Sequence, residues 1–564
     1  MTPGSRPRPG LLALAALAVC FTAADTYVIV LALPDVMHGV GLSVDELQRG
    51  APIVSGFLLG YVVMLPLIGR LADLRGRSSV LVAGLVLFAT GSFVTAMALG
   101  LPTVVLGRLV QGIGAGALVP ATLALVADLY PVERRAVPLG LVSAAQELGA
   151  VLGPLLGAAV LAVTDWRAIF VLNLLAGAVL AAAIRSRDPR RVPWPDPVGV
   201  LLLAIVAAAA VLLVLKPGAV LRDVTWGRLY VPVAGLSDWM TPLGLAVIAG
   251  TALFLLRCAL ARHPLVDLRG WARDARRADL TGAILLAIAL GGIVLAFSDS
   301  DPKVSVLTPL GGWYLAVAAL ASVVLVAHLR RVADPLLPAE VLRASAGGMA
   351  TSLFVGAALV VALVDIPLFA RTTIYTDSQL LAALVLVRFL VALPVGAVAG
   401  GLLVRRLPPA LVAAAGMLAA AAAFAWMATW SPTALSSPLA TVPLVLGGLG
   451  FGLALAPINH AVLAAAPPRA HGVASAVVVV ARMVGMLVGI SVLTAIGLRR
   501  YYAEQADLPP VQEVCHGASR CDAFTDLIQA AGVAQEHTVF AGAAVAALVA
   551  ATLAGVVLAP SRTR

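Results

Sequence analysis

The sequence predicts an all-α membrane protein built from two similar six-helix bundles, with additional membrane-spanning helices between them. Apolar residues make up 61% of the 564 residues and charged residues only 12%, which is far outside the range of soluble domains. Apolar stretches of about 20 residues, the length that a helix needs to cross a bilayer, recur along the whole chain. The stretches in the two halves also share a pattern of small residues, which indicates a duplication.

Scanning with this length predicts sixteen spans, with fourteen as the alternative count. A cytoplasmic tail of residues 1–10 precedes the N-terminal bundle of residues 11–184, whose six spans cover 11–33, 51–69, 79–99, 103–129, 137–163 and 167–184. The linker region, residues 185–348, contains two hairpins with spans at 198–216, 242–260, 279–297 and 313–329. The C-terminal bundle of residues 349–564 has spans at 349–370, 380–404, 409–430, 440–465, 472–497 and 538–558, and its residues 498–538 form an outer extension.

The arginines orient these spans. With the N-terminus inside, most basic loop residues lie on the cytoplasmic side, and the main exceptions are Arg49, Arg222, Arg228, Lys303, Arg371, Arg499 and Arg500. The positive-inside rule therefore predicts a multi-pass protein of the bacterial inner (plasma) membrane with both termini in the cytoplasm. The net charge of +10 is not gathered into a basic face, so we expect no nucleic-acid binding.

Two kinds of internal repeat support a duplicated architecture. Small residues in the fifth span recur in the fifteenth at a constant offset, namely Gly140, Ser143, Gly153 and Gly157 against Gly472, Ser475, Gly485 and Gly489. Small residues also serve general helix packing, but packing alone would not require a constant offset. The two linker hairpins each begin after an aspartate, Asp196 and Asp279, and resemble each other.

Four blocks in the first half resemble the major facilitator superfamily, in particular its drug:proton antiporter branch with linker spans. They are Asp25-Thr26-Tyr27 in the first span, the loop Gly69–Arg77, Arg108–Gly114 in the fourth span and Gly149–Gly157 in the fifth. The resemblance implies the major facilitator fold and transport by alternating access. It also implies a cytoplasmic gate formed by Gly69, Asp73, Gly76 and Arg77, and an antiporter motif formed by Gly149, Gly153, Pro154 and Gly157.

A narrower resemblance is to the mycobacterial triacylglycerol exporters that work with a periplasmic lipoprotein. It rests on Ala145–Gly149, Leu363–Asp365 and Ala481–Met486. The resemblance implies a lipid substrate, a lipoprotein partner and helices in the outer extension that guide lipid away from the bilayer. That family has one linker hairpin where this chain has two, so the substrate does not transfer directly.

Placing a charged side chain within a span costs roughly 2.5 to 3.5 kcal/mol of free energy. Each such residue therefore indicates a binding partner or a functional role. Asp25 and Asp365 lie in the first span of each half, and we expect both to face a central cavity at similar depth. Either one could carry the transported proton, the alternative being a structural hydrogen bond between helices. Arg108 is either the partner of a carboxylate or an element of a proton relay, and the family resemblance favours the relay.

Glu147 and Arg482 occupy equivalent spans of the two halves and carry opposite charges. We therefore expect an ion pair between the bundles, formed in one state and broken in the other, with Glu147 contributing to proton coupling. Gln111, Gln146 and Arg388 complete the expected cavity lining. At the gate, Asp73 is expected to cap a helix N-terminus, whereas the equivalent loop of the second half has no acid.

Cys515 and Cys521 lie in the outer extension, on the oxidising side of the membrane. They predict a disulfide, with two free thiols as the alternative. No C-x-x-C pair, His-rich cluster or phosphate-binding loop is present, so we expect no metal, cofactor or ATP dependence and no enzyme activity.

Together these features predict a monomeric, proton-coupled exporter of a hydrophobic substrate, most simply a lipid such as triacylglycerol. The alternatives are a multidrug:proton antiporter that exports a hydrophobic drug, and a receptor or channel that performs no transport cycle.

Overall fold

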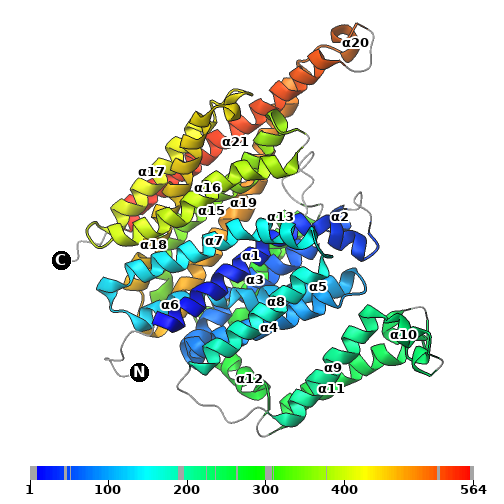
Figure 1. The fold of residues 1–564 in the computed structure, drawn as a ribbon. Coiled ribbons are helices and arrows are strands. Elements are labelled where there is room, and N and C mark those ends of the chain that lie inside the picture. The colour runs from blue at the N-terminus through cyan, green and yellow to red at the C-terminus, as the bar shows by residue number, and fades with distance from the viewer. Residues whose placement is uncertain are drawn as a thin grey trace.

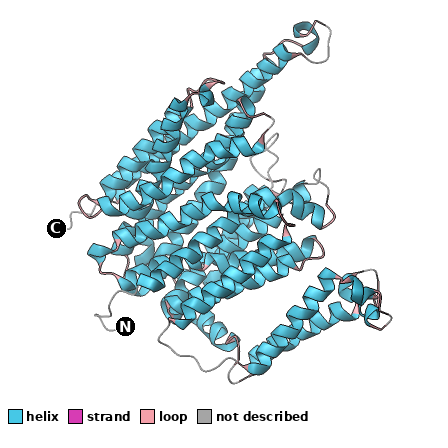
Figure 2. Cartoon of the chain, in the orientation of Figure 1, coloured by secondary structure: helices cyan, strands magenta, loops and turns pink. Residues whose placement is uncertain are grey.

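The computed structural model describes residues 9–42, 47–50, 52–187, 196–223, 225–235, 237–261, 264–298, 308, 310–376, 378–516 and 521–558. The regular structure of these residues is entirely helical (Figure 2). Sixteen of the helices are long and apolar enough to cross a membrane, in agreement with the larger of the two predicted counts. Residues 1–8 of the predicted tail lie outside the described residues.

Twelve of these spans form two groups of six that lie side by side (Figure 1). The first group consists of α1 (Pro9–Gly39), α3 (Pro52–Arg75), α4 (Arg77–Ala96), the consecutive helices α5 (Leu101–Gly116) and α6 (Leu118–Leu129), α7 (Ala136–Leu161) and α8 (Arg167–Ser186). The second group consists of α15 (Ala339–Thr373), α16 (Gln379–Leu403), α17 (Pro409–Met427), α18 (Thr441–Ala465), α19 (His471–Ala506) and α21 (Asp522–Val557).

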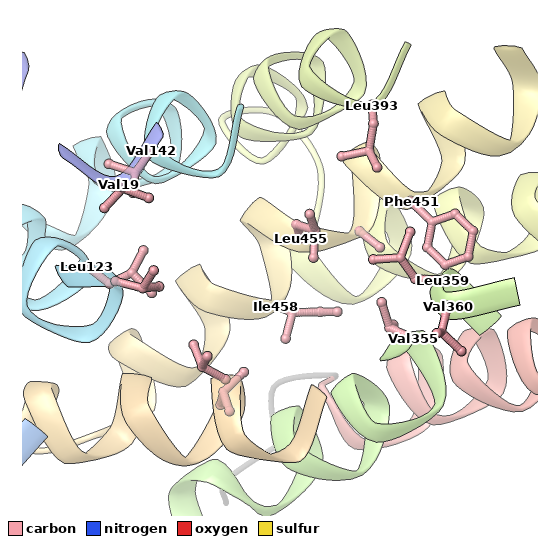
Figure 3. Close-up of a cluster of buried hydrophobic side chains, with 14 of the residues drawn as sticks. Val19, Leu123, Val142, Val355, Leu359, Val360, Leu393, Phe451, Leu455 and Ile458 are labelled. Carbon is pink, nitrogen blue, oxygen red and sulfur yellow. The ribbon is translucent and has the colours of Figure 1, made fainter. Parts of the chain in front are cut away.

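The two groups, called here the N-terminal and C-terminal bundles, meet through α3 against α19 and α7 against α16. One cluster of buried apolar side chains runs through both bundles, and Figure 3 shows part of it, with Val19 and Leu123 from the first bundle and Leu455 and Ile458 from the second. The membrane side at which α1 begins and α21 ends is called the terminal side below (Figure 1).

Glycines let the helices approach closely, both between and within the bundles. A Cβ atom on Gly69 would lie 2.5 Å from the carbonyl oxygen of Gly472, so the backbones of α3 and α19 touch there. Within the bundles, a Cβ on Gly153 would meet the Ala24 carbonyl oxygen at 2.4 Å, and a Cβ on Gly485 would meet that of Leu353 at 1.9 Å. The repeated glycines of α7 and α19 thus make equivalent contacts with the first helix of each bundle.

The linker forms two hairpins, α9 (Pro197–Leu215) with α11 (Pro242–Leu260), and α13 (Leu280–Ser298) with α14 (Gly311–Leu329). Helix α13 packs against both α3 and α19, whereas the α9–α11 hairpin projects from the body of the molecule (Figure 1). In each hairpin the aspartate before the first helix binds a basic side chain of the second: Asp196 binds Arg257 at 2.7 Å and Asp279 binds His328 at 2.7 Å. This shared contact supports the duplication of the hairpins.

Four short α-helices among the described residues had no counterpart in the sequence prediction. They are α2 (Leu47–Gly50), α10 (Gly218–Leu221), the amphipathic helix α12 (Leu268–Arg277) between the hairpins, and α20 (Val511–Val514).

Helices α19 and α21 continue beyond the ends of the other helices and form the projection at the upper right of Figure 1. A disulfide joins Cys515 and Cys521 at its tip. The predicted last span begins at residue 538, but α21 already begins at Asp522, because its first turns are polar and carry no membrane signal.

Candidate functional site

A buried polar network occupies the interior of the N-terminal bundle. Arg108 on α5 donates from Nη1 to Oδ2 of Asp25 on α1 at 2.8 Å, and the two side chains are 0% and 1% exposed. Asn173 on α8 donates to the second carboxylate oxygen of Asp25. Arg108 also donates to Gln111 at 2.8 Å, and Gln111 donates to Ser92 at 3.0 Å. One carboxylate is therefore held by a cation and an amide from two other helices.

The rest of the Arg108 guanidinium faces the same bundle. Its Cζ lies 4.3 Å from the centre of the Phe57 ring, and its Nε donates to the Ile53 carbonyl at 3.3 Å. The expectation that Asp25 faces a central cavity is therefore wrong, because all of its observed partners belong to its own bundle. Of the two interpretations of Arg108, the structure shows the carboxylate partner. An apolar hollow between α1, α7 and α8 reaches Asp25 and Asn173, and Leu156, Gly157 and Leu172 are among its lining residues.

The C-terminal bundle holds its acids differently. Gln529 on α21 donates to the Thr372 carbonyl of α15 at 2.9 Å, which fixes the register of these helices. Asp365 lies seven residues before Thr372 and Glu536 seven after Gln529, so the antiparallel helices bring the two carboxyl groups to the same level. Both are buried, at 3% and 1% exposure, and they interact electrostatically.

No cation among the described residues balances this pair. Within the described part of the chain neither carboxyl forms an ion pair. Glu536 accepts a hydrogen bond from Gln535 at 3.2 Å, and its Oε2 is buried with no hydrogen-bond partner among the described residues. Sequence reasoning missed Glu536 because residue 536 fell into the predicted outer extension, and it missed Asn173 because an asparagine in a span carries no charge signal.

The expectation that Asp25 and Asp365 lie at similar depth is also wrong. The equivalent glycine contacts pair Ala24 with Leu353. Asp25 follows Ala24 by one residue, whereas Asp365 follows Leu353 by twelve. The difference of eleven residues corresponds to about 16 Å along a helix, so Asp365 lies nearer the far side of the membrane than Asp25 does.

Glu147 and Arg482 lie where the two bundles face each other. Glu147 on α7 is buried and interacts electrostatically with Arg482 on α19, and both charges act on Tyr27 and Tyr61. The described residues show no ion pair within 4.0 Å between Glu147 and Arg482. The nearest polar contact of Glu147 is a hydrogen bond of 3.5 Å from Gln146. The pair predicted from the sequence is therefore not formed in this structure.

The end of α3 joins the two bundles at the terminal side. Asp73 accepts hydrogen bonds from the backbone N–H groups of Gly472 at 2.9 Å and Val473 at 3.2 Å, at the start of α19. The carboxylate thus faces the positive end of a helix from the other bundle. Arg77 bridges Asp73 at 2.9 Å and Asp128 at 3.2 Å.

Glycines also contribute to this contact between the bundles. Gly76 adopts φ = 100°, which other residues rarely adopt, and Gly69 provides the close contact with Gly472 described above. The corresponding contact between α7 and α16 consists of glycine and backbone: a Cβ on Gly401 would lie 2.6 Å from the Ala136 carbonyl oxygen. The bundles are therefore closely apposed along both seams on the terminal side.

The remaining predicted residues serve contacts within a bundle. Gly149 and Gly153 let α7 approach α1, where Cβ atoms would meet the Cys20 and Ala24 carbonyl oxygens at 2.1 and 2.4 Å. Pro154 lies within α7. Arg388 on α16 donates to Thr441 on α18 of its own bundle at 3.1 Å.

Comparison with known proteins agrees with this architecture. A family model described as Major Facilitator Superfamily matches residues 15–333. The triacylglyceride transporter of Mycolicibacterium smegmatis is 36% identical over 505 residues, which is 87% of this chain and 76% of the relative. The triacylglyceride transporter of Mycobacterium tuberculosis is 36% identical over 86% of this chain and 82% of its own. The crystal structure of the human organic anion transporter MFSD10 aligns with 98% of this chain and 100% of the MFSD10 chain, with a TM-score of 0.57. The sequence identity is 14%, so this similarity is one of fold.

Proposed function

Because the chain belongs to the major facilitator superfamily, a family of membrane transporters, we propose that it exports a lipid such as triacylglycerol in exchange for protons. The observation that carries the proposal is the distribution of charge. Asp25, Arg108 and Arg388 find partners inside the bundles, so that, apart from Asp73 at the terminal side, Glu147 and Arg482 are the described charges that act across the bundle interface. An interface with so few charges suits an apolar cargo, and the relatives named triacylglyceride transporters match over most of the chain.

The positive-inside rule places the terminal side in the cytoplasm. The contact of Asp73 with the start of α19 then acts as a cytoplasmic gate that closes the inner side while cargo leaves outward. Opening inward requires this carboxylate to leave two backbone N–H groups. The extension of α19 and α21 lies on the opposite, periplasmic side, where it can contact a lipoprotein or guide lipid.

Protons enter this cycle through the buried carboxyl groups. Glu147 carries a negative charge toward Arg482 when ionised, and protonation removes the attraction between the bundles. A change in proton occupancy at Glu147 therefore alters how strongly the bundles hold together. Asp365, with Glu536 beside it, provides a second proton site within the C-terminal bundle, and Arg108 holds Asp25 as a relay element or structural anchor.

The test is transport by the full chain reconstituted in lipid vesicles with an imposed pH gradient. Labelled triacylglycerol and a cationic dye are compared as cargo. We expect gradient-dependent movement of triacylglycerol, lost in Glu147→Gln and kept in Glu340→Gln, a matched change at an exposed acid that pairs with Arg469. Movement of the dye alone would identify a multidrug:proton antiporter, which shares the motif of α7. Movement of neither would contradict the proposal.

A charge exchange tests the contact between the bundles directly. Glu147→Arg and Arg482→Glu should each abolish export because each leaves two like charges facing across the interface. The double variant should recover part of the activity. No recovery relative to the single variants would remove the ion pair from the mechanism.

A further inference from the structure

Helix α12 is bound to the end of α3 through one arginine. Arg75 is the last residue of α3, and it binds Asp267 at 2.7 Å and Asp274 at 2.9 Å. Its guanidinium lies 4.4 Å from the centre of the Trp271 ring. Residues 267, 271 and 274 recur at the spacing of one helix face, so Arg75 holds a single stripe of α12.

Asp267 anchors this stripe. Its side chain caps α12 by accepting the Gly270 N–H at 2.9 Å. This hydrogen bond, followed by that from Arg75, lowers the pKa of Asp267, which therefore stays ionised at neutral pH. The contact with Arg75 is accordingly a charged one under physiological conditions.

The opposite face of α12 carries only positive charge. At 100° per residue, four exposed arginines gather on the side away from Arg75, and they are Arg269, Arg273, Arg276 and Arg277. Within the described part of the chain none of the four forms an ion pair. We call this face the arginine stripe.

The position of α12 brings the arginine stripe to the membrane surface. Helix α11 crosses the membrane and ends at Leu260, and α13 crosses it and begins at Leu280. The ten residues of α12 connect these two ends on the terminal side, at the level where α3 ends. A short helix with a cationic face at this depth has the character of an interfacial helix that meets lipid headgroups.

We propose that the arginine stripe binds the headgroups of anionic lipids. We also propose that this binding stabilises the closed gate, because Arg75 connects α12 to the end of α3. The occupant follows from charge complementarity, since four arginines at a membrane surface attract anionic headgroups. The link to the gate is short: Arg75 lies two residues after Asp73 and directly before Gly76, the hinge into α4. A lipid-anchored α12 holds the end of α3 in the position from which Asp73 reaches α19.

Lipid binding is tested by hydrogen exchange of residues 268–277 in the full chain, in nanodiscs of phosphatidylcholine alone or with phosphatidylglycerol. We expect at least a tenfold slower exchange with phosphatidylglycerol, and a loss of that difference in Arg273→Gln/Arg276→Gln and at high salt. The matched control is Arg405→Gln/Arg406→Gln, which removes two exposed arginines from the same side of the C-terminal bundle and should keep the difference. Equal exchange rates in both membranes would overturn the lipid site, and so would a lipid-dependent difference that persists in Arg273→Gln/Arg276→Gln. The arginines would then serve only to orient the chain in the membrane.

Coupling to the gate has a separate readout, and this half of the inference rests on the proposed gate role of Asp73. Ser475 lies behind the gate, where it is 2% exposed and donates to the Pro120 carbonyl of the other bundle. A cysteine at this position, in a Cys20→Ser/Cys258→Ser background, should be labelled several times more slowly with phosphatidylglycerol than without. Arg75→Gln should remove this lipid effect while lipid-dependent exchange of α12 persists. Labelling that ignores lipid while exchange responds would overturn the coupling. Neither measurement requires transport, so the results of both are independent of which cargo the protein carries.

Discussion

The N-terminal bundle surrounds its buried acid with a cation and an amide, whereas the C-terminal bundle places two acids side by side. Asp25 has Arg108 and Asn173 within hydrogen-bonding distance. Asp365 has Glu536 instead, and no cation among the described residues pairs with either. An ion pair in a dry environment is stable only while both charges persist. Two adjacent carboxyl groups repel when both are ionised, so such a pair retains a proton.

The difference assigns different tasks to equivalent halves of a duplicated fold. The first network fixes helices α1, α5 and α8 to one another and resists any change of charge. The second can gain or lose a proton without breaking a salt bridge. The halves also differ at the terminal side, where the first contributes the Asp73 carboxylate and the second contributes backbone N–H groups and the Ser475 hydroxyl. On the far side, among the described helices, α19 and α21 extend beyond the bundle.

Arg108→Gln should have the largest effect, because it leaves Asp25 buried without its cation. Breaking one partner of a buried ion pair typically costs 3 to 5 kcal/mol, so we expect poor folding and a large drop in the thermal midpoint in detergent. Asp25→Asn/Arg108→Gln should recover much of the loss, since it removes both charges. If the single variant is as stable as the double, Asp25 and Arg108 do not form the anchor that distinguishes the first half.

Asp73→Asn should weaken closure on the terminal side. The carboxylate accepts two backbone N–H groups of α19, and a hydrogen bond to a charged group contributes about 1.5 to 3 kcal/mol. We expect a cysteine at Ser475 to be labelled at least tenfold faster. The control is Asp128→Asn, which also loses a contact with Arg77 but none with the second bundle. Equal labelling in both variants would show that backbone packing at Gly69 suffices for closure.

The sequence indicates the spans and the charged residues but not how those residues pair. Sixteen apolar stretches and the repeated glycines of α7 and α19 carry enough local signal to predict the architecture. The partners of Asp25 depend on long-range packing, since Asn173 lies 148 positions away and is chemically unremarkable in sequence. Glu536 was hidden because the polar first turns of α21 shift the apparent start of the last span. Helix α12 escaped detection because it is too short and too polar to resemble a span.

Asp365→Asn and Glu536→Gln sharpen the contrast between the bundles. Each removes the repulsion between the two acids, so we expect thermal stability to stay the same or rise. Export driven by a pH gradient should fall about tenfold, which corresponds to about 1.4 kcal/mol, while exchange of cargo without a gradient continues. The double variant should be no worse than either single one, because the two groups hold one shared proton.

The control for these variants is Asp526→Asn, at an exposed acid of the same helix α21, which should leave gradient-driven export unchanged. An additive loss in the double variant would mean that Asp365 and Glu536 act as separate groups. Unchanged export in both single variants would reduce the pair to a structural feature and remove the functional contrast with Asp25.

Cys515→Ser/Cys521→Ser should have the smallest effect. The disulfide closes a ring with a sequence separation of six, for which loop-closure entropy gives about 2 kcal/mol, and this acts on the tip of the extension alone. Because the bond constrains the tip and not the packing of the bundles, the main thermal transition should not move. Protease cleavage near residues 511–516 should become faster in the double variant. If the main transition falls as well, the extension is part of the folding unit of the C-terminal bundle, and the halves differ in stability as well as in length.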